Sequence, residues 1–236
     1  MVQVSRIKII SMGDERVGKS CLIKRFCEEK FVDKYVPTIG IDFGVKPCPM
    51  VGGQVRVNFW DMAGGSEYYA VRSEFYVDAQ GALLVFDVCN KASFERLAAW
   101  MEEARSHGAP PGMCYAVCGN KTDAARRRAV PEVEARRCAL ACRTARVELQ
   151  RPSFPRPLAS HSLTALRARG PRSNRARVTP DGYPDAPLPP AASRFAFGVG
   201  AMYYETSAKD GSNVGVMFED LFKQACLLRA AALALG

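Results

Sequence analysis

Residues 13–20 fit the pattern G-x-x-x-x-G-K-[ST], which is typical of a loop that binds phosphate groups. The apolar pattern of residues 4–10 predicts a strand before this loop, and the spacing of apolar residues over 21–27 predicts a helix after it. A strand, a glycine-bounded loop and a helix N-terminus form an anion site, because backbone N–H groups and the helix dipole both favour negative charge. Lys19 would reach the β- and γ-phosphates of a nucleotide, and the Ser20 hydroxyl would bind Mg²⁺. A chance glycine-rich turn is the alternative for this motif taken alone.

A second part of a phosphate site follows two predicted strands. Residues 41–45 and 54–60 have strand patterns, and the glycines within 51–53 predict that the two strands form a hairpin. The second strand leads directly into Asp61, which is followed three positions later by Gly64. A carboxylate at a strand end can hold the water shell of Mg²⁺, and a glycine lets a backbone N–H group approach a terminal phosphate.

Three more strands are predicted further along the chain. Residues 81–88 and 113–118 are continuous apolar runs, the pattern of strands that are covered on both faces. Residues 201–204 form a shorter run of the same kind. Each run leads into a polar segment, at 119–123 and at 205–209 for the last two.

Helices are predicted between these strands. Ser93 can cap a helix whose inward face carries Phe94, Leu97, Trp100 and Met101. A second helix begins at Pro131 and runs to about residue 142, and a third spans 214–228 with its inward face formed by Val214, Met217, Phe218, Leu221 and Phe222. Strands that alternate with helices predict an α/β fold, a doubly wound, mostly parallel six-stranded sheet with about five helices. Its ligand should lie at the carboxyl ends of the strands.

Composition predicts one domain with an appended or inserted segment. The chain has 236 residues, of which 48% are hydrophobic, enough to bury one good core. Its net charge is +9, but residues 146–200 contain nine arginines, no lysine and three acids, so this stretch contributes +6. The basic character is therefore mostly a property of one segment, and we expect no specific nucleic-acid binding by the body of the protein.

The nine cysteines form no C-x-x-C pair, and the chain has only two histidines, so a zinc site is not indicated. We expect reduced cysteines that act as small core residues, which favours the cytoplasm, with the nucleus or the periphery of a membrane as alternatives. No signal peptide and no apolar span of 18 residues is present. Residue 2 is Val and no cysteine lies near the last residue, so we expect no lipid anchor on this chain as written and only indirect membrane contact.

Together these motifs resemble those of a Ras-superfamily small GTPase of the Rab-like branch, whose fold is the P-loop NTPase G domain. Five nucleotide motifs occur in the family's order, and the resemblance covers roughly residues 4–143 and 201–229. The greatest similarity is to the RBJ type, Rab-like GTPases that in animals carry a C-terminal J domain. The motifs are residues 13–20, Thr38 within 37–44, residues 60–64, residues 120–123 and residues 205–209.

The resemblance implies GTP or GDP with Mg²⁺ as the ligands. Asn120 and Asp123 would bind the guanine edge, Lys121 would pack along the base, and Phe31 would stack near it, although an exposed loop aromatic is the alternative for Phe31. Ser20, Thr38 and Asp61 are implied at the metal, and Lys19, Thr38 and Gly64 at the reacting γ-phosphate. The full set of implied nucleotide-binding residues is Gly13, Glu15, Arg16, Val17, Gly18, Lys19, Ser20, Cys21, Phe31, Thr38, Asp61, Gly64, Asn120, Lys121, Asp123, Ser207, Ala208 and Lys209.

Two departures from the family pattern bear on catalysis. Gly65 stands where the family has a glutamine that orients the attacking water, and glycine has no side chain to do so. Glu15 stands in the phosphate loop where small residues are usual; it would repel the γ-phosphate unless it points to solvent. We therefore expect a GTP/GDP switch with slow intrinsic hydrolysis. The alternative is a hydrolysis-deficient, GTP-bound scaffold, while the guanine motifs argue against a small-molecule kinase.

The third departure is the stretch 146–200, which separates a first part of the G domain, 1–145, from its last strand and helix, 201–236. It holds nine of the fifteen prolines and lacks periodic apolar residues, so it cannot repay the entropy of ordering. Three interpretations stay open: a basic arm for acidic membrane or RNA, a disordered loop, or translated non-coding sequence in the gene model.

The resemblance also implies partners. Effectors, exchange factors and GTPase-activating proteins (GAPs) would contact residues 36–46 and 64–78, and we expect a monomer. The prenylated tail of Rab proteins is missing, and no His-Pro-Asp sequence of a J domain occurs. From this we expect a tail-less or a truncated form.

Overall fold

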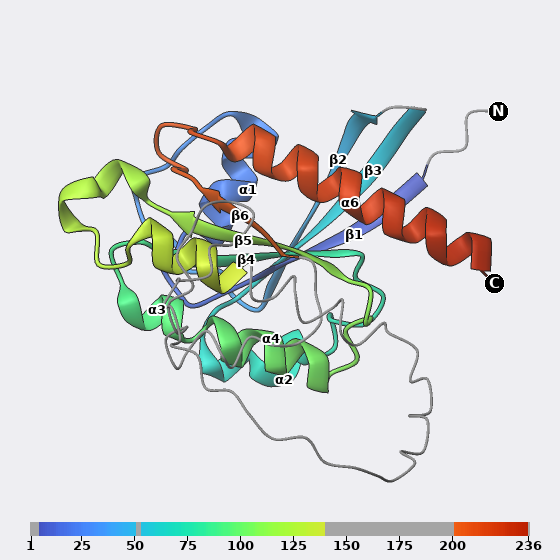
Figure 1. Ribbon diagram of the computed structural model, residues 1–236, viewed down its shortest axis with the longest axis horizontal. Helices are drawn as coiled ribbons and strands as arrows, with labels where there is room; N and C mark the ends of the chain where they lie inside the picture. The colour runs from blue at the N-terminus through green and yellow to red at the C-terminus, as the bar shows by residue number, and fades with distance from the viewer. Residues whose placement is uncertain (1–4, 51–52, 140–200, 236) are drawn as a thin grey trace, which may run out of the picture.

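The computed structural model describes residues 5–50, 53–139 and 201–235 and contains a six-stranded sheet (Figure 1). The strand order is β2-β3-β1-β4-β5-β6. Among the paired strands, β2 and β3 are antiparallel, with Met50 opposite Gly53, and the other neighbours are parallel. The predicted α/β fold is confirmed. The strands are β1 (Ser5–Met12), β2 (Ile41–Met50), β3 (Gly53–Met62), β4 (Gly81–Asp87), β5 (Cys114–Asn120) and β6 (Ala201–Glu205).

Helices cover both faces of the sheet, with α1 and α6 on one face and α2, α3 and α4 on the other (Figure 1). Residues 132–139 are also helical and pack on the face of α4. The α-helices with defined bounds are α1 (Lys19–Glu28), α2 (Tyr69–Ser73), α3 (Lys91–Glu95), α4 (Leu97–Ser106) and α6 (Val214–Leu235), and two short 3₁₀ helices are η1 (Ser66–Tyr68) and η2 (Thr122–Arg127).

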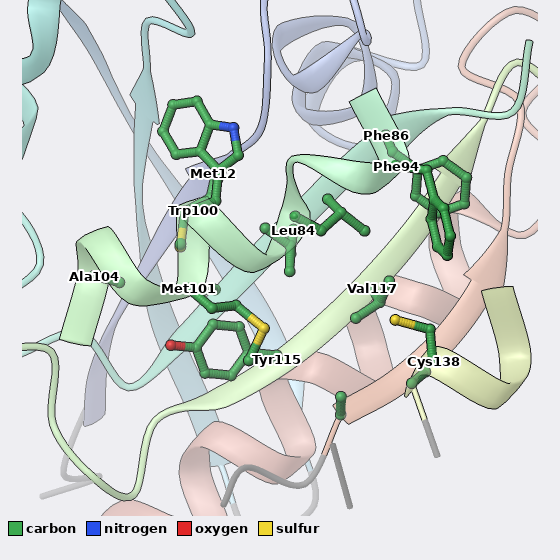
Figure 2. Close-up of a cluster of buried hydrophobic side chains, with 14 of the residues drawn as sticks. Met12, Leu84, Phe86, Phe94, Trp100, Met101, Ala104, Tyr115, Val117 and Cys138 are labelled. Atoms are coloured by element: carbon green, nitrogen blue, oxygen red, sulfur yellow. The ribbon is translucent and has the colours of Figure 1, made fainter. Parts of the chain in front are cut away.

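The core on the α4 face consists of side chains from β4 and β5 packed against α3 and α4. Figure 2 shows Phe86 of β4 beside Phe94 of α3, and Leu84 of β4 between Phe94 and Met101 of α4. Every residue of β5 is buried, as the continuous apolar run predicts for a strand with helices on both faces. This packing fixes the carboxyl ends of the central strands.

The core on the opposite face is aromatic. Phe218 of α6 packs against Phe26 of α1, with ring centroids 4.6 Å apart, and against Phe59 of β3, with centroids 5.6 Å apart. Phe222 joins the same group one helical turn later. These contacts hold α1, and with it the end of the phosphate loop, against the sheet.

Two local predictions were wrong. Asn90, not Ser93, caps α3: its side-chain oxygen accepts hydrogen bonds from the N–H groups of Ala92 and Ser93. Ser93 is buried within α3, where its hydroxyl donates to the Asn90 carbonyl and accepts from the Asp87 N–H. The last helix does not end near residue 228 but continues to Leu235, because the alanine- and leucine-rich sequence there favours helix.

The proposed insertion, 146–200, and the end of the helix predicted to reach residue 142 lie outside the described residues. The structure nevertheless places β6 beside β5 in parallel register, with Tyr115 opposite Ala201. Among the described residues, six cysteines are free thiols: Cys21, Cys27, Cys48, Cys89, Cys118 and Cys226. No helix in the described part of the chain combines the length and the apolar character that crossing a bilayer requires.

Replacing Phe218 with alanine should lower the free energy of unfolding by about 3–5 kcal/mol, because the cavity would open inside the aromatic group. Chemical denaturation followed by fluorescence measures this loss. Val216 lies on the same helix with 56% of its surface exposed, so Val216→Ala is the matched control and should change stability by at most about 0.5 kcal/mol. Equal losses in the two variants would contradict the assigned packing of α6.

Candidate functional site

A cavity of about 810 Å³ lies at the carboxyl ends of the parallel strands. The segments that follow β1, β3, β5 and β6 contribute to its wall, together with the loop between α1 and β2. This volume is in the range of nucleotide-sized ligand sites. The structure thus brings together residues from all five sequence motifs, which are up to 196 positions apart between Gly13 and Lys209 in the chain.

The phosphate loop depends on two glycines with left-handed backbones. Gly13 has a φ of 133°, and a Cβ there would collide with the Val85 carbonyl of β4. Gly18 has a φ of 99°, and a Cβ there would collide with the side-chain amide of Asn120. Both positions combine a conformation that other residues rarely adopt with a lack of space for a side chain. The loop can therefore curve tightly into the start of α1.

Lys19, the first residue of α1, points back into the loop. Its Nζ donates hydrogen bonds to the carbonyls of Gly13, at 2.8 Å, and Asp14, at 2.9 Å. Burial lowers the pKa of Lys19 to about 8, although the nearby carboxylates of Asp61 and Asp14 oppose this effect. An anion bound in the loop would supply the countercharge that this buried ammonium group lacks.

The predicted metal ligands lie beside the phosphate loop. The Ser20 Oγ and Thr38 Oγ1 atoms are 2.8 Å apart, although they come from different segments. Asp61 is buried behind them, and the Ser11 hydroxyl donates to its Oδ1 at 2.6 Å while also accepting from the Met62 N–H. Two hydroxyls and a carboxylate are hard oxygen donors, the type that Mg²⁺ prefers, so these residues fit that ion.

The opposite end of the cavity is organised by Asn120. Its Nδ2 donates to the Val17 carbonyl of the phosphate loop at 2.8 Å, and its Oδ1 accepts from the Ala208 N–H at 3.2 Å. Asp123 lies next to it and accepts a hydrogen bond from the Ser207 hydroxyl at 2.8 Å. Asp123 also lines the cavity, so its carboxylate can reach a ligand bound there.

Ion pairs and hydrogen bonds outside the cavity hold its remaining walls. Lys121 forms an ion pair with Asp87 at 2.7 Å, which fixes its aliphatic stem along the cavity. Arg25 of α1 donates to the carbonyls of Ala208 and Lys209 and so joins α1 to the segment after β6. Phe31 lines the cavity and is partly buried against the aromatic core rather than fully exposed.

The remaining predicted residues divide into lining and supporting groups. Glu15 and Arg16 are exposed at the cavity rim, and the Arg16 guanidinium lies 5.1 Å from the ring centre of Tyr35. Gly18, Cys21 and Gly64 also contribute to the lining. Four predicted residues do not line the cavity but lie behind its wall: Gly13, Val17, Asp61 and Ser207.

The segment after β3 is clamped to the phosphate loop through a buried arginine. Arg72 donates to the Gly65 carbonyl and forms two hydrogen bonds with Glu103 of α4, at 2.6 and 2.8 Å. Its guanidinium stacks on the ring of Trp100 at 4.4 Å, and the Trp100 Nε1 donates to Asp14 at 2.8 Å. Gly64 is pressed directly against the loop, because a Cβ there would lie 2.5 Å from the carbonyl carbon of Asp14.

Sequence reasoning missed the residues that hold the site from behind: Ser11, Arg25, Arg72 and Asp87. None of them belongs to a motif, and each acts on a segment that is distant in the sequence. Of these four residues, Asp87 could have been predicted from the sequence. It ends a buried strand, and that strand lies next to the strand that ends in Asn120. Polar residues at adjacent strand ends are candidates for a common site.

Comparison with known proteins places this geometry in context. The sequence matches the Ras family over residues 8–150, which is more than half of the chain. It is 49% identical over 135 residues to "DnaJ homolog subfamily C member 27" from Homo sapiens, Bos taurus and Gallus gallus. Each alignment covers 56% of this chain and 50% of the relative, so the chain spans about half the length of these relatives.

The buried ammonium group of Lys19 should make the binding of a phosphate anion in the loop dependent on pH. Below pH 8 Lys19 carries its proton with or without ligand, whereas above pH 8 the ligand-free protein must take up a proton in order to bind. Affinity for a nucleoside triphosphate should therefore fall by up to about tenfold per pH unit above pH 8. Titration of fluorescent nucleotide into nucleotide-free protein between pH 7 and pH 9.5 measures the effect.

The matched control is Lys19→Met, which should bind the nucleotide weakly at every pH and show no fall in affinity above pH 8. Any ionisation of the nucleotide itself affects both proteins equally. The same pH profile in both proteins would show that Lys19 is not the titrating group.

Proposed function

The chain belongs to the Ras family of small GTPases, and from this premise we propose that it binds GTP and GDP with Mg²⁺ and acts as a nucleotide-dependent switch with slow intrinsic hydrolysis. The observation that carries the proposal is the cavity itself: the phosphate loop, the Ser20 and Thr38 hydroxyls and the Asn120–Asp123 pair line it, and the buried Asp61 carboxylate lies behind its wall. The pairing of β6 with β5 supports one G domain formed by 1–145 and 201–236, with 146–200 as an insertion between them.

Guanine selectivity is assigned to Asp123 and Asn120. A carboxylate offers only hydrogen-bond acceptors, so Asp123 favours a base edge that presents two adjacent donors, as guanine does and adenine does not. Asn120 is already bound to Val17 and Ala208 and therefore has a fixed orientation. Ala208 and Lys121 cover the two faces of the base, and Phe31 closes the outer side.

At the other end, Lys19 and the backbone of the phosphate loop are assigned to the β- and γ-phosphates. Ser20 and Thr38 would hold Mg²⁺ through their hydroxyls, and Asp61 would act from behind them, in a position fixed by Ser11. When bound, the ion neutralises charge that develops on the phosphate oxygens.

Two contacts that exist only while the γ-phosphate is bound would make the site a switch. Thr38 and Gly64 lie on separate segments and would both contact the γ-phosphate, so hydrolysis would release both segments. The exposed apolar residues of these segments would bind effectors, exchange factors and GAPs in one of the two states. The residues with large exposed surface there are Val36, Ile39, Phe43, Val45, Tyr69, Val71 and Val77.

Slow hydrolysis is inferred from Gly65 and Glu15. Gly65 offers no side chain to orient water, and the exposed Glu15 carboxylate at the cavity rim adds negative charge that would repel the γ-phosphate. A second candidate function follows from the same observation, a scaffold that keeps GTP bound without turnover. The two functions differ in one measurable quantity, the lifetime of bound GTP.

The test is to identify the nucleotide that co-purifies with the protein and then follow single-turnover hydrolysis of GTP with Mg²⁺. Hydrolysis over minutes to hours would support the switch, and GTP that persists for days would support the scaffold. Absence of guanine nucleotide together with no measurable affinity for GTP would refute both.

Gly65→Gln should raise the single-turnover rate by about tenfold or more, because the amide supplies both an acceptor for water and a donor to the γ-phosphate. The double variant with Glu15→Gly should be at least as fast, since it also removes a negative charge from the rim. The measurement is release of phosphate from preloaded protein. If neither variant is faster, Gly65 does not limit the rate.

A further inference from the structure

The carboxylate of Glu67 occupies the space beside Gly65 that a longer side chain would need. A Cβ built on Gly65 would lie 2.5 Å from the Glu67 Oε1 and 2.6 Å from its carboxyl carbon. The side chain of Glu67 also lines the nucleotide cavity, together with Gly64, Gly65 and Thr38. Among the described residues, this carboxylate has no hydrogen-bond or ion-pair partner, so its oxygens are available to a ligand.

The backbone of Gly65 does not itself require glycine. Its φ of −69° and ψ of 146° are those of ordinary extended chain, which any residue adopts. The space for a Cβ at this position is instead taken by the Glu67 carboxylate, the end of a flexible side chain that an added side chain would displace. Because residue 65 has no side chain, the Glu67 carboxylate can lie next to its backbone.

The backbone of Gly65 is held against the phosphate loop. Arg72 donates to the Gly65 carbonyl and is itself fixed by its paired hydrogen bonds to Glu103. Trp100 supports Arg72 from one side and is bonded to Asp14 of the phosphate loop. This chain of contacts keeps the backbone at Gly65 beside the loop in which the γ-phosphate would lie.

We propose that Glu67 replaces the missing glutamine: its carboxylate accepts a hydrogen bond from the water that attacks the γ-phosphate and orients it for attack. This assignment rests on the proposed GTPase function. In the step, a lone pair of the water oxygen forms a bond to the γ-phosphorus, and the bond from that phosphorus to the β–γ bridging oxygen breaks. Its electron pair leaves with GDP, and the water proton directed at Glu67 passes to the released phosphate.

The same chemistry explains slow turnover. A carboxylate can accept from the water but, unlike an amide, cannot donate to the γ-phosphate. Its negative charge also faces a negative substrate, which raises the energy of the crowded reacting state. Glu67 thus orients the attacking water but lacks the hydrogen bond with which a glutamine stabilises the γ-phosphate in the reacting state.

Glu67→Ala should lower the single-turnover rate of GTP hydrolysis by about tenfold or more, because the water loses its oriented acceptor. Glu67→Gln keeps an acceptor, adds a donor and removes the charge, so its rate should equal or exceed that of the unaltered protein. The control is Glu95→Ala, which removes the same charge from an exposed position on α3 outside the cavity and should leave the rate unchanged. Affinity for GTP and Tm in the GDP-bound state should stay close to the unaltered values in all three variants, which separates catalysis from folding.

Gly65→Ala gives an independent test by steric means. The added methyl group would displace the Glu67 carboxylate without altering its charge or the extended backbone. This variant should lose as much rate as Glu67→Ala, and the double variant Gly65→Ala with Glu67→Ala should be no slower than either single change, because both remove the same contact.

The outcomes distinguish the role of Glu67 from the proposed GTPase function on which it rests. Normal GTP binding with an unchanged or raised rate in Glu67→Ala would overturn the role of Glu67, a raised rate being expected if the carboxylate only repels the substrate. GTP that stays bound and unhydrolysed in the unaltered protein would overturn this role as well and leave the scaffold. Failure of the unaltered protein to bind GTP would instead overturn the proposed function itself.

Discussion

The hydrogen bonds of one buried side chain, that of Asn120, connect the three segments on which the whole site depends. Its amide reaches the phosphate loop at Val17 and the segment after β6 at Ala208, while its own backbone ends β5. A buried amide group is costly to leave without partners, so each of these bonds favours the assembled state over any arrangement in which a segment moves away. The phosphate end and the base end of the cavity are therefore positioned relative to each other by a single residue.

This constraint explains why the last part of the chain matters to a site that begins near residue 13. The family match ends at residue 150, and β6 follows only after 200. Yet Ala208 supplies an N–H to Asn120 and a carbonyl to Arg25 of α1. Two hydrogen bonds in opposite directions make this short segment part of the phosphate-loop framework as well as part of the base pocket. A long intervening sequence is compatible with such a site, because the cost of closing a loop grows only slowly with its length.

Sequence alone predicted the elements whose signal is local. The apolar runs that became β4 and β5 and the glycine pattern of the phosphate loop depend on neighbours in the chain. The prediction of the α3 cap failed because two residues that can cap a helix, Asn90 and Ser93, lie only three positions apart. The choice there depends on Ser93 being needed in the interior, where its hydroxyl bonds to the Asp87 N–H. The support that Ser11 gives to Asp61 was also out of reach, because it depends on the register between β1 and β3.

Position 65 shows most clearly why a missing side chain cannot be interpreted from a motif. In the sequence, Gly65 is only the loss of a glutamine, and slow hydrolysis is the natural inference. In the structure, the same glycine is the space into which the Glu67 carboxylate fits, and Arg72 holds that backbone against the loop through Glu103 and Trp100. The chemical capacity of a site is set by which atoms reach the reacting centre, not by which position in the motif supplies them. A substitution that removes one such group can therefore admit another from two residues away, provided that the backbone between them is fixed.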